Sequence, residues 1–155
     1  MVWPHDLIGV VLAAVLGAVI GLEREISGKA AGLRTNILIC LGAAIFTIIS
    51  KQMAETGGSV TRIAAQVVTG VGFLGAGAII QDRGGIHGLT TAATIWLVAS
   101  IGMACGAGFY SLAVISTLIA IVVLIGLARL AKSPERAEAK QEPNSPVDEK
   151  AGQNQ

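Results

Sequence analysis

The sequence predicts an all-α integral membrane protein, a bundle of five transmembrane helices. Residues 84–128 contain no Asp, Glu, Lys or Arg, and over the whole chain 53% of residues are hydrophobic and only 14% are charged. Typical soluble domains carry about 25% charged residues, and a bilayer core takes roughly 20 helical residues to cross. The uncharged stretch is therefore long enough for two spans, with Gly106 and Gly108 at the turn between them.

Five apolar runs lie between charged breaks, at residues 7–22, 35–50, 63–80, 90–105 and 109–127. Several are near the short limit for a span, which favours tilt, local thinning of the bilayer or close association. Helices are the predicted spanning element, because a barrel would need strands of alternating polarity. The first run leads into charged residues rather than a small-residue cleavage site, so we interpret it as a retained span.

Lys and Arg are distributed unequally between the two sides of these runs. Nine of the 11 follow the first run, the third run or the last run, and only Lys51 and Arg62 fall on the other side. Because Lys and Arg concentrate in cytoplasmic loops, we expect an outside N-terminus and a cytoplasmic C-terminus. Residues 1–131 are the expected transmembrane domain. Residues 132–155 are polar and are expected to form a disordered cytoplasmic tail.

The sequence also argues against several classes of protein. The net charge is +1 and no basic stripe is present, so no nucleic-acid partner is expected. There is no Ser-His-Asp set, metal-ligand spacing or P-loop, so we predict that the protein is not an enzyme and needs no organic cofactor. Cys40 and Cys105 are expected near opposite faces of the membrane, as small buried residues too far apart to pair.

Glycine is abundant and regularly placed, which predicts close helix packing. Small residues recur every four positions in the first run, and such ridges allow another helix to approach closely. The ridge serves either packing inside one subunit or the seam of a homodimer or higher oligomer. A second set occupies the third run. The predicted packing residues are Gly9, Ala13, Gly17, Gly21, Gly70, Gly72, Gly75 and Gly77.

The third run also matches the spacing G-x-G-x-x-G between Gly70 and Gly75. No strand or βαβ unit surrounds the match, so we interpret it as a glycine-lined helix face rather than a nucleotide loop. The alternative is a kinked or broken helix that lines a cavity, as in transporters. Gln66 and Thr69 are the main polar side chains of this run, and they would line a pathway in that case.

Polar residues gather in the two connections expected on the cytoplasmic side. Both connections open on the same side of a five-span bundle, so their side chains are expected to converge at its mouth. An unpaired charge at the edge of a low-dielectric region is costly, and a partner is expected. The predicted functional polar cluster consists of Glu23, Arg24, Glu25, Arg34, Thr35, Asp82, Thr90, Thr91 and Trp96.

Two interpretations of this cluster remain open. In the first, the carboxylates of Glu23, Glu25 and Asp82 pair with neighbouring arginines and fix the loops, while basic side chains anchor to headgroups. In the second, the cluster binds a cation such as Mg²⁺, with Glu23 and Asp82 as ligands, or a partner protein. Mg²⁺ needs only one or two carboxylates and keeps several waters, although a nearby arginine opposes cation binding.

Four motifs in this polar and glycine-rich framework resemble the MgtC/SapB family of bacterial inner-membrane proteins. They are Gly21-Leu-Glu23-Arg24-Glu25, Gly28-Lys29-Ala-Ala-Gly32-Leu-Arg34-Thr35, Gly70-Val-Gly72-Phe-Leu-Gly75-Ala-Gly77 and Gly88-Leu-Thr90-Thr91-Ala-Ala-Thr94-Ile-Trp96. The resemblance implies a five-helix domain in the bacterial inner membrane and a link to growth in low Mg²⁺. Many members of that family continue into a folded cytoplasmic domain, whereas this sequence continues into a short polar tail and looks similar to a shorter branch.

Two functional hypotheses follow. The first is a non-enzymatic protein that regulates other membrane proteins, linked by the resemblance to adaptation to low Mg²⁺ or stress. The second is a subunit of a cation transporter or channel, of the Mg²⁺ type. The five apolar runs contain no acidic or basic residue, which is untypical of proton-coupled transporters. This absence favours regulation.

Overall fold

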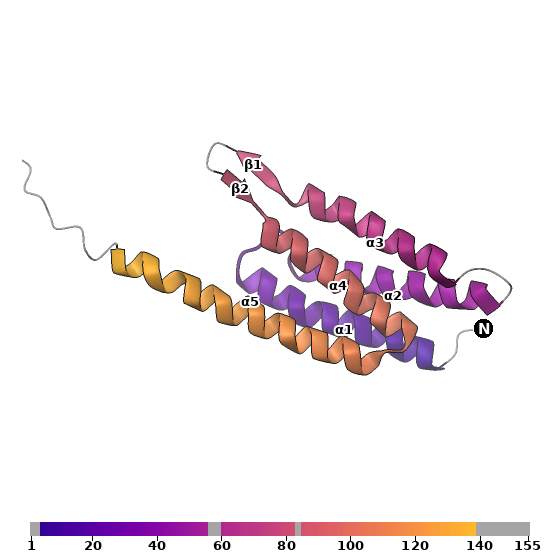
Figure 1. Cartoon of the computed structure of the whole chain (residues 1–155). Coiled ribbons are helices and arrows are strands. Elements are labelled where there is room, and N and C mark those ends of the chain that lie inside the picture. The colour runs from indigo at the N-terminus through magenta and orange to yellow at the C-terminus, as the bar shows by residue number, and fades with distance from the viewer. Residues whose placement is uncertain (1–3, 56–59, 83–84, 139–155) are drawn as a thin grey trace, which may run out of the picture. The chain divides into compact units, whose positions relative to one another are not determined.

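The computed structural model describes residues 4–55, 60–82 and 85–138, with side chains described at all of these except residues 55, 60–61, 81–82 and 127–138. Five α-helices follow one another along the chain (Figure 1). They are α1 (Pro4–Ile26), α2 (Leu33–Glu55), α3 (Val60–Gly77), α4 (Leu89–Ala107) and α5 (Tyr110–Glu138). The predicted number of helices in this part of the chain is confirmed.

Three of the described helices are long and apolar enough to cross a membrane. These segments are Pro4–Ile26, Leu33–Ala54 and Leu89–Ala107, and Tyr110–Gly126 is a shorter apolar helical segment. At 1.5 Å per residue, the 18 residues of α3 are about 27 Å long. The span of α3 and the orientation of the bundle stay predictions.

The chain divides into two compact units, Met1–Ile121 and Val122–Gln155. Within the first unit, α1 packs against α2 and α4, and α3 packs against α2 and α4. The α1–α2 connection and the α3–α4 connection lie at the same end of this unit (Figure 1). The convergence of these two connections, on which the predicted polar cluster depends, is therefore present.

Small residues contribute many of the contacts between helices, and a whole face of large apolar residues points outward. Along α1 the buried positions include Gly9, Ala13, Gly17 and Gly21, together with Leu16 and Ile20. The opposite face of α1 exposes large apolar side chains, namely Leu7, Ile8, Val11, Val15, Val19 and Leu22. A continuous apolar face of this kind is rare on a water-soluble monomer, whereas helices in lipid associate through small residues.

The glycines of α1 and α4 are sites of direct backbone contact. A Cβ on Gly17 would lie 2.9 Å from the carbonyl oxygen of Asn36 on α2, and a Cβ on Gly102 would lie 2.1 Å from the carbonyl oxygen of Cys40. A Cβ on Gly9 would lie 2.6 Å from the carbonyl oxygen of Cys105. The small-residue ridge of α1 is thus occupied inside one chain, and it no longer supports a homodimer seam.

The glycines predicted to pack on α3 behave differently. Only Gly75 is buried, with Ala92 of α4 about 3.7 Å from the position that its Cβ would take. A Cβ added to Gly70, Gly72 or Gly77 would meet no atom within 4 Å. Within the described chain, these three glycines do not pack against another helix.

A short β-hairpin joins α3 to α4, which the sequence analysis did not predict. Strand β1 (Ile80–Asp82) pairs antiparallel with β2 (Gly85–His87), with Ile80 opposite His87. The third run was expected to stay helical to residue 80, but α3 ends at Gly77 because Ile80 belongs to this ladder. Gly88 then takes a left-handed φ of 88°, and a Cβ there would lie against the carbonyl oxygen of Ala78.

Two other expectations differ from the structure. Cys40 and Cys105 are both buried free thiols, and they do not lie near opposite faces. Gly102, one turn before Cys105, packs on the backbone of Cys40, because α4 is shifted along α2. Helix α5 continues past the expected boundary at residues 131/132 to Glu138, although Pro134 lies within this extension and proline is unfavourable in a helix interior. The rest of the expected tail, residues 139–155, lies outside the described residues.

The glycine contacts predict that Gly102→Ala destabilises the bundle. The new methyl group would overlap the Cys40 carbonyl, and overpacking of this kind costs about 1–3 kcal/mol. The free energy of unfolding, measured by SDS titration in mixed micelles and followed by circular dichroism, should fall by that amount. The matched variant Gly72→Ala meets open space and should leave stability unchanged or slightly higher. Equal stability of the two variants would contradict the packing described.

Candidate functional site

A buried ion pair lies near the end of α1. Arg24 is only 3% exposed and Glu23 is 11% exposed. The guanidinium donates from Nη2 to Oε1 of Glu23 at 2.8 Å and from Nε to Oε2, which makes the pair bidentate. Oε1 also accepts a hydrogen bond from the Ser27 hydroxyl at 2.8 Å. The negative charge of Glu23 is therefore already compensated within the chain, as the structural interpretation of the cluster expects.

Asn36 is the most deeply buried polar side chain at this end of the bundle, with 0% exposure. Its Nδ2 donates to the carbonyl oxygens of Ala31 at 2.7 Å and Gly32 at 2.8 Å, and thereby fixes the start of α2. Its Oδ1 is buried without a hydrogen-bond partner among the described residues. The sequence analysis missed Asn36, although an Asn next to Arg34 and Thr35 inside an apolar run was a signal that could have found it.

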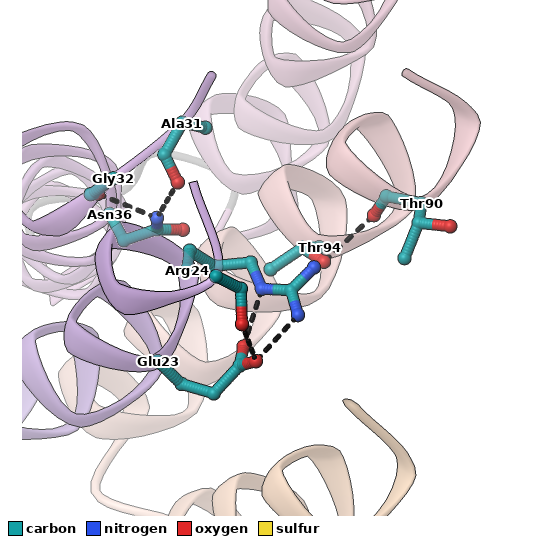
Figure 2. Close-up of polar contacts among 8 residues, drawn as sticks. Glu23, Arg24, Ala31, Gly32, Asn36, Thr90 and Thr94 are labelled. Carbon is teal, nitrogen blue, oxygen red and sulfur yellow. Dashed lines mark hydrogen bonds and ion pairs between the residues drawn. The ribbon is translucent and has the colours of Figure 1, made fainter. Parts of the chain in front are cut away.

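Helix α4 adds two buried hydroxyl groups. Thr91 is 5% exposed and Thr94 is 4% exposed, and the Thr94 hydroxyl donates to the carbonyl oxygen of Thr90 at 2.8 Å. Arg24, Asn36 and Thr94 extend from three different helices into the region between α1, α2 and α4 (Figure 2). These side chains form a buried polar layer, to which the predicted cluster contributes Arg24 and Thr91.

Glu25 caps the next helix. Its Oε2 accepts a hydrogen bond from the backbone N–H of Leu33, the first residue of α2, at 2.9 Å. A carboxylate at this position satisfies an otherwise free N–H group and is stabilised by the positive end of the helix. Gly32 lies directly against the same carboxylate. Glu25 therefore fixes the α1–α2 connection.

Arg34 and Thr35, by contrast, are exposed on the first turn of α2. Among the described residues, the Arg34 guanidinium has no hydrogen bond or ion pair. A positive charge in the first turn opposes the helix dipole, at a cost of about 0.3–1 kcal/mol at an exposed site. These two residues are available to the surroundings and do not hold the fold.

Asp82 and Trp96 are not among the described side chains of the buried layer. Asp82 ends β1, and its side chain is outside the described part of the structure, so its expected approach to Glu23 stays a prediction. Trp96 is 54% exposed, and it lines a groove with Val68 of α3 and Met103 of α4. Trp96 therefore faces the surroundings of the bundle and not the Arg24 layer.

The two residues expected to line a pathway are on the outside of the bundle. Gln66 and Thr69 are both exposed. The Thr69 hydroxyl donates back to the carbonyl oxygen of Ala65 at 3.3 Å, and Gln66 lines an outer groove between α2 and α3. One chain alone does not enclose these two side chains.

A second polar layer lies at the opposite end, and it was missed because its residues sit just beyond the apolar runs. Asp6 of α1 is 7% exposed and accepts a hydrogen bond from Nε2 of Gln52 on α2 at 3.3 Å. Lys51 reaches the carbonyl oxygens of Gly106 and Ala107 at 3.5 Å, where the negative end of α4 favours a cation. The Tyr110 hydroxyl donates to the His5 carbonyl at 2.6 Å. Helices α1 and α2, unlike the corresponding apolar runs, contain charged residues near both ends.

No group of three or more His, Cys, Asp or Glu side chains that could hold a metal ion occurs among the described residues. Glu23 and Asn36 are the nearest approach to an oxygen ligand set in the buried layer. Arg24 lies against Glu23, and its positive charge repels a cation. The side chains of this layer hydrogen-bond within their own helix or to the α1–α2 connection.

The outward-facing apolar side chains and the small-residue contacts define a multi-pass membrane protein. The chain belongs to the MgtC family, whose sequence model matches residues 10–133. This confirms the family resemblance. With its bacterial relatives, the family membership identifies it as a protein of the bacterial inner membrane. No solved structure matches the chain.

Several proteins named MgtC or YhiD are similar to the chain in sequence. The chain is 47% identical over 125 residues to the "Putative magnesium transporter YhiD" of Escherichia coli K12, with 76% of this chain and 58% of YhiD covered. It is 44% identical over 126 residues to the MgtC protein of Brucella abortus, with 79% of this chain and 52% of the relative covered. For the MgtC protein of Salmonella paratyphi A the identity is 42% over 144 residues, covering 90% of this chain and 61% of the relative. The chain thus spans little more than half the length of these relatives.

The buried ion pair predicts a clear difference between removing one partner and removing both. Arg24→Gln leaves the Glu23 carboxylate partly buried without its counter-charge and should lower the free energy of unfolding by about 2 kcal/mol. The double variant with Glu23→Gln should be less destabilised than the sum of the single variants. Urea or SDS titration of the four proteins gives the coupling energy. Arg34→Gln, an exposed control, should change stability little, and strict additivity at positions 23 and 24 would contradict the ion pair.

Proposed function

We propose that this protein is a non-enzymatic membrane protein that regulates other membrane proteins. The observation that carries the proposal is the division of the predicted polar cluster. Glu23 and Arg24 pair with each other, and Glu25 caps α2, whereas Arg34 is exposed without a partner in the described chain. An arginine kept at a position that opposes the helix dipole needs a compensating role.

The chemistry of Arg34 specifies what it would contact. A guanidinium offers five donors in a planar fork and binds carboxylates and phosphates in a bidentate manner. We propose that a partner presents an acidic side chain at this end of the bundle, which is expected to face the cytoplasm. The competing explanation is that Arg34 only anchors the orientation of the chain, as basic residues near cytoplasmic helix ends commonly do.

A pull-down of the tagged full chain from detergent-solubilised bacterial membranes distinguishes these explanations. A stoichiometric membrane-protein partner should be recovered with the wild-type chain and lost with Arg34→Ala. Arg34→Lys should recover it weakly, because Lys keeps the charge but not the fork. Lys29→Ala, which removes an exposed charge from the same connection, is the matched control. Equal recovery with all four chains, or recovery of the chain alone, contradicts the proposal.

The second candidate is a subunit of a cation transporter or channel. Its support is the name of the relative YhiD, which proposes magnesium transport, and the position of Gln66 in a groove rather than in contact with another described side chain. Because Gln66 and Thr69 face outward, a pathway lined by them would need further helices from a second subunit. A single closed bundle would not conduct through these residues.

Mg²⁺ flux into liposomes tests this second candidate. Vesicles that contain a Mg²⁺-sensitive dye and the purified full chain should show no flux above protein-free vesicles if the regulatory proposal holds. Flux that appears with the wild-type chain and falls with Gln66→Leu would instead establish transport. The conservative variant Thr69→Ser serves as the control, because it keeps the hydroxyl group.

A further inference from the structure

Helix α3 has glycines at positions that no other part of the described chain approaches closely. In α1 and α4, Gly17, Gly21, Gly102 and Gly106 lie against the backbone or Cβ atoms of α2. On α3, a Cβ at Gly70 or Gly77 would meet no atom within 4 Å. A glycine in a helix interior costs about 1 kcal/mol relative to alanine, and close approach of another helix is the usual compensation in membranes.

An apolar groove lies along the same side of α3. It has a volume of about 460 Å³ and runs between α2 and α3. Gly42 and Phe46 of α2 line one wall, and Gln66, Gly70 and Leu74 line the other. A Cβ on Gly42 would also meet no atom within 4 Å. The groove therefore has an open glycine on each of its two walls.

Gln66 distinguishes this groove from an ordinary lipid-facing surface. Its primary amide is exposed and, among the described residues, makes no hydrogen bond. Gln66 is six residues after the start of α3, or about 9 Å along the helix. Acyl chains offer neither a donor nor an acceptor, and an unsatisfied amide in hydrocarbon is costly. The occupant of the groove must supply both a donor and an acceptor.

We propose that a second copy of this chain docks on the α2/α3 groove, with the Gln66 amides of the two copies hydrogen-bonded to each other. A primary amide has one acceptor oxygen and two N–H donors, so two glutamines facing each other satisfy both requirements. In a two-fold symmetric interface, a residue near the axis meets its own counterpart. Gly70, one turn after Gln66, allows the two α3 backbones to approach.

The length of α3 supports the same occupant. Its 18 residues reach about 27 Å, slightly less than the ~30 Å of a bilayer core. A span shorter than the bilayer is accommodated in part by association with other helices. This proposal concerns self-association and does not depend on the regulatory function proposed for Arg34.

Disulfide cross-linking in native membranes tests the contact directly. The full chain with Gln66→Cys should form a covalent dimer when oxidised with copper phenanthroline. The wild-type chain should not, because its two thiols, Cys40 and Cys105, are buried. Val15→Cys, on the outward face of α1, is the matched control and should remain monomeric. Cross-linking of Gln66→Cys to a different protein, or no cross-linking at all, overturns the proposal.

The strength of association gives an independent test. Energy transfer between donor-labelled and acceptor-labelled full chains in liposomes reports the dimerisation constant. Gln66→Leu should weaken dimerisation roughly three- to thirtyfold, the range expected for a hydrogen bond between membrane helices. Gly70→Ile should weaken it more, and Gly126→Ile, also a glycine with no neighbour within 4 Å, should leave it unchanged.

A control for correct folding accompanies the dimerisation measurement. A Cβ at position 70 meets no atom within 4 Å among the described residues and the groove beside it is open, so the helical circular dichroism signal and the unfolding midpoint of Gly70→Ile should match those of the wild type. A wild-type chain that stays monomeric at every protein-to-lipid ratio contradicts the proposal. Dimerisation that is equally strong in Gly70→Ile and the wild type contradicts it as well.

Discussion

The structure depends on the close approach of the backbones of α1, α2 and α4, which only glycine permits. Gly17 and Gly21 of α1 lie on the first turns of α2, and Gly102 and Gly106 of α4 lie on the middle of α2. In lipid there is no hydrophobic drive between helices, so van der Waals contact and hydrogen bonds must hold them together. Backbone contact is therefore a main element of the bundle, and many of its large apolar side chains face outward.

The same contacts determine where polar groups can be buried. Asn36 contributes its carbonyl oxygen to the contact with Gly17 and its Cβ to the contact with Gly21, so its side chain is enclosed as soon as α1 and α2 meet. Arg24 follows Gly21 by one turn on the same face of α1 and is buried for the same reason. A bidentate bond to Glu23 then compensates its charge. The polar layer follows from the glycine ridge, which explains why Glu23 serves the fold while Arg34, on the outer face of α2, remains available.

The sequence was informative about helices and much less so about which polar residues meet. The uncharged runs were sufficient to predict the number of helices. The four-residue spacing of small residues was sufficient to predict the packing ridge of α1. They could not show that Gly17 meets Asn36 of the same chain, because a ridge has the same spacing whether its partner belongs to the same subunit or to another. The shift of α4 along α2, which brings Cys105 to within about one turn of the level of Cys40, also depends on tertiary contacts. Hairpin strands of three residues each are too short to give a periodic signal.

The polar cluster shows the same limit at the level of single residues. Loop position and charge identified Glu23, Arg24 and Glu25, but their roles differ because one carboxylate meets a guanidinium and the other a helix N-terminus. Asn36 lay inside an apolar run and carried no charge, so a search for charged residues passed over it. Asp6 and Lys51 lie just outside the apolar runs at residues 7–22 and 35–50, whereas α1 and α2 extend far enough to include them.

Nuclear Overhauser transfer between glycine Hα atoms and neighbouring side chains of α2 measures the close approach of α1 and α4 to α2 most directly. In micelles of uniformly labelled chain, contacts from Gly17 to the Cβ protons of Cys40 and from Gly102 to the methyl group of Ala43 are expected. In a mixture of labelled and unlabelled chains, filtered for intermolecular transfer, both should be absent. Their absence from the first sample would contradict the contacts described, and their appearance in the second would show that the glycine ridge joins different subunits.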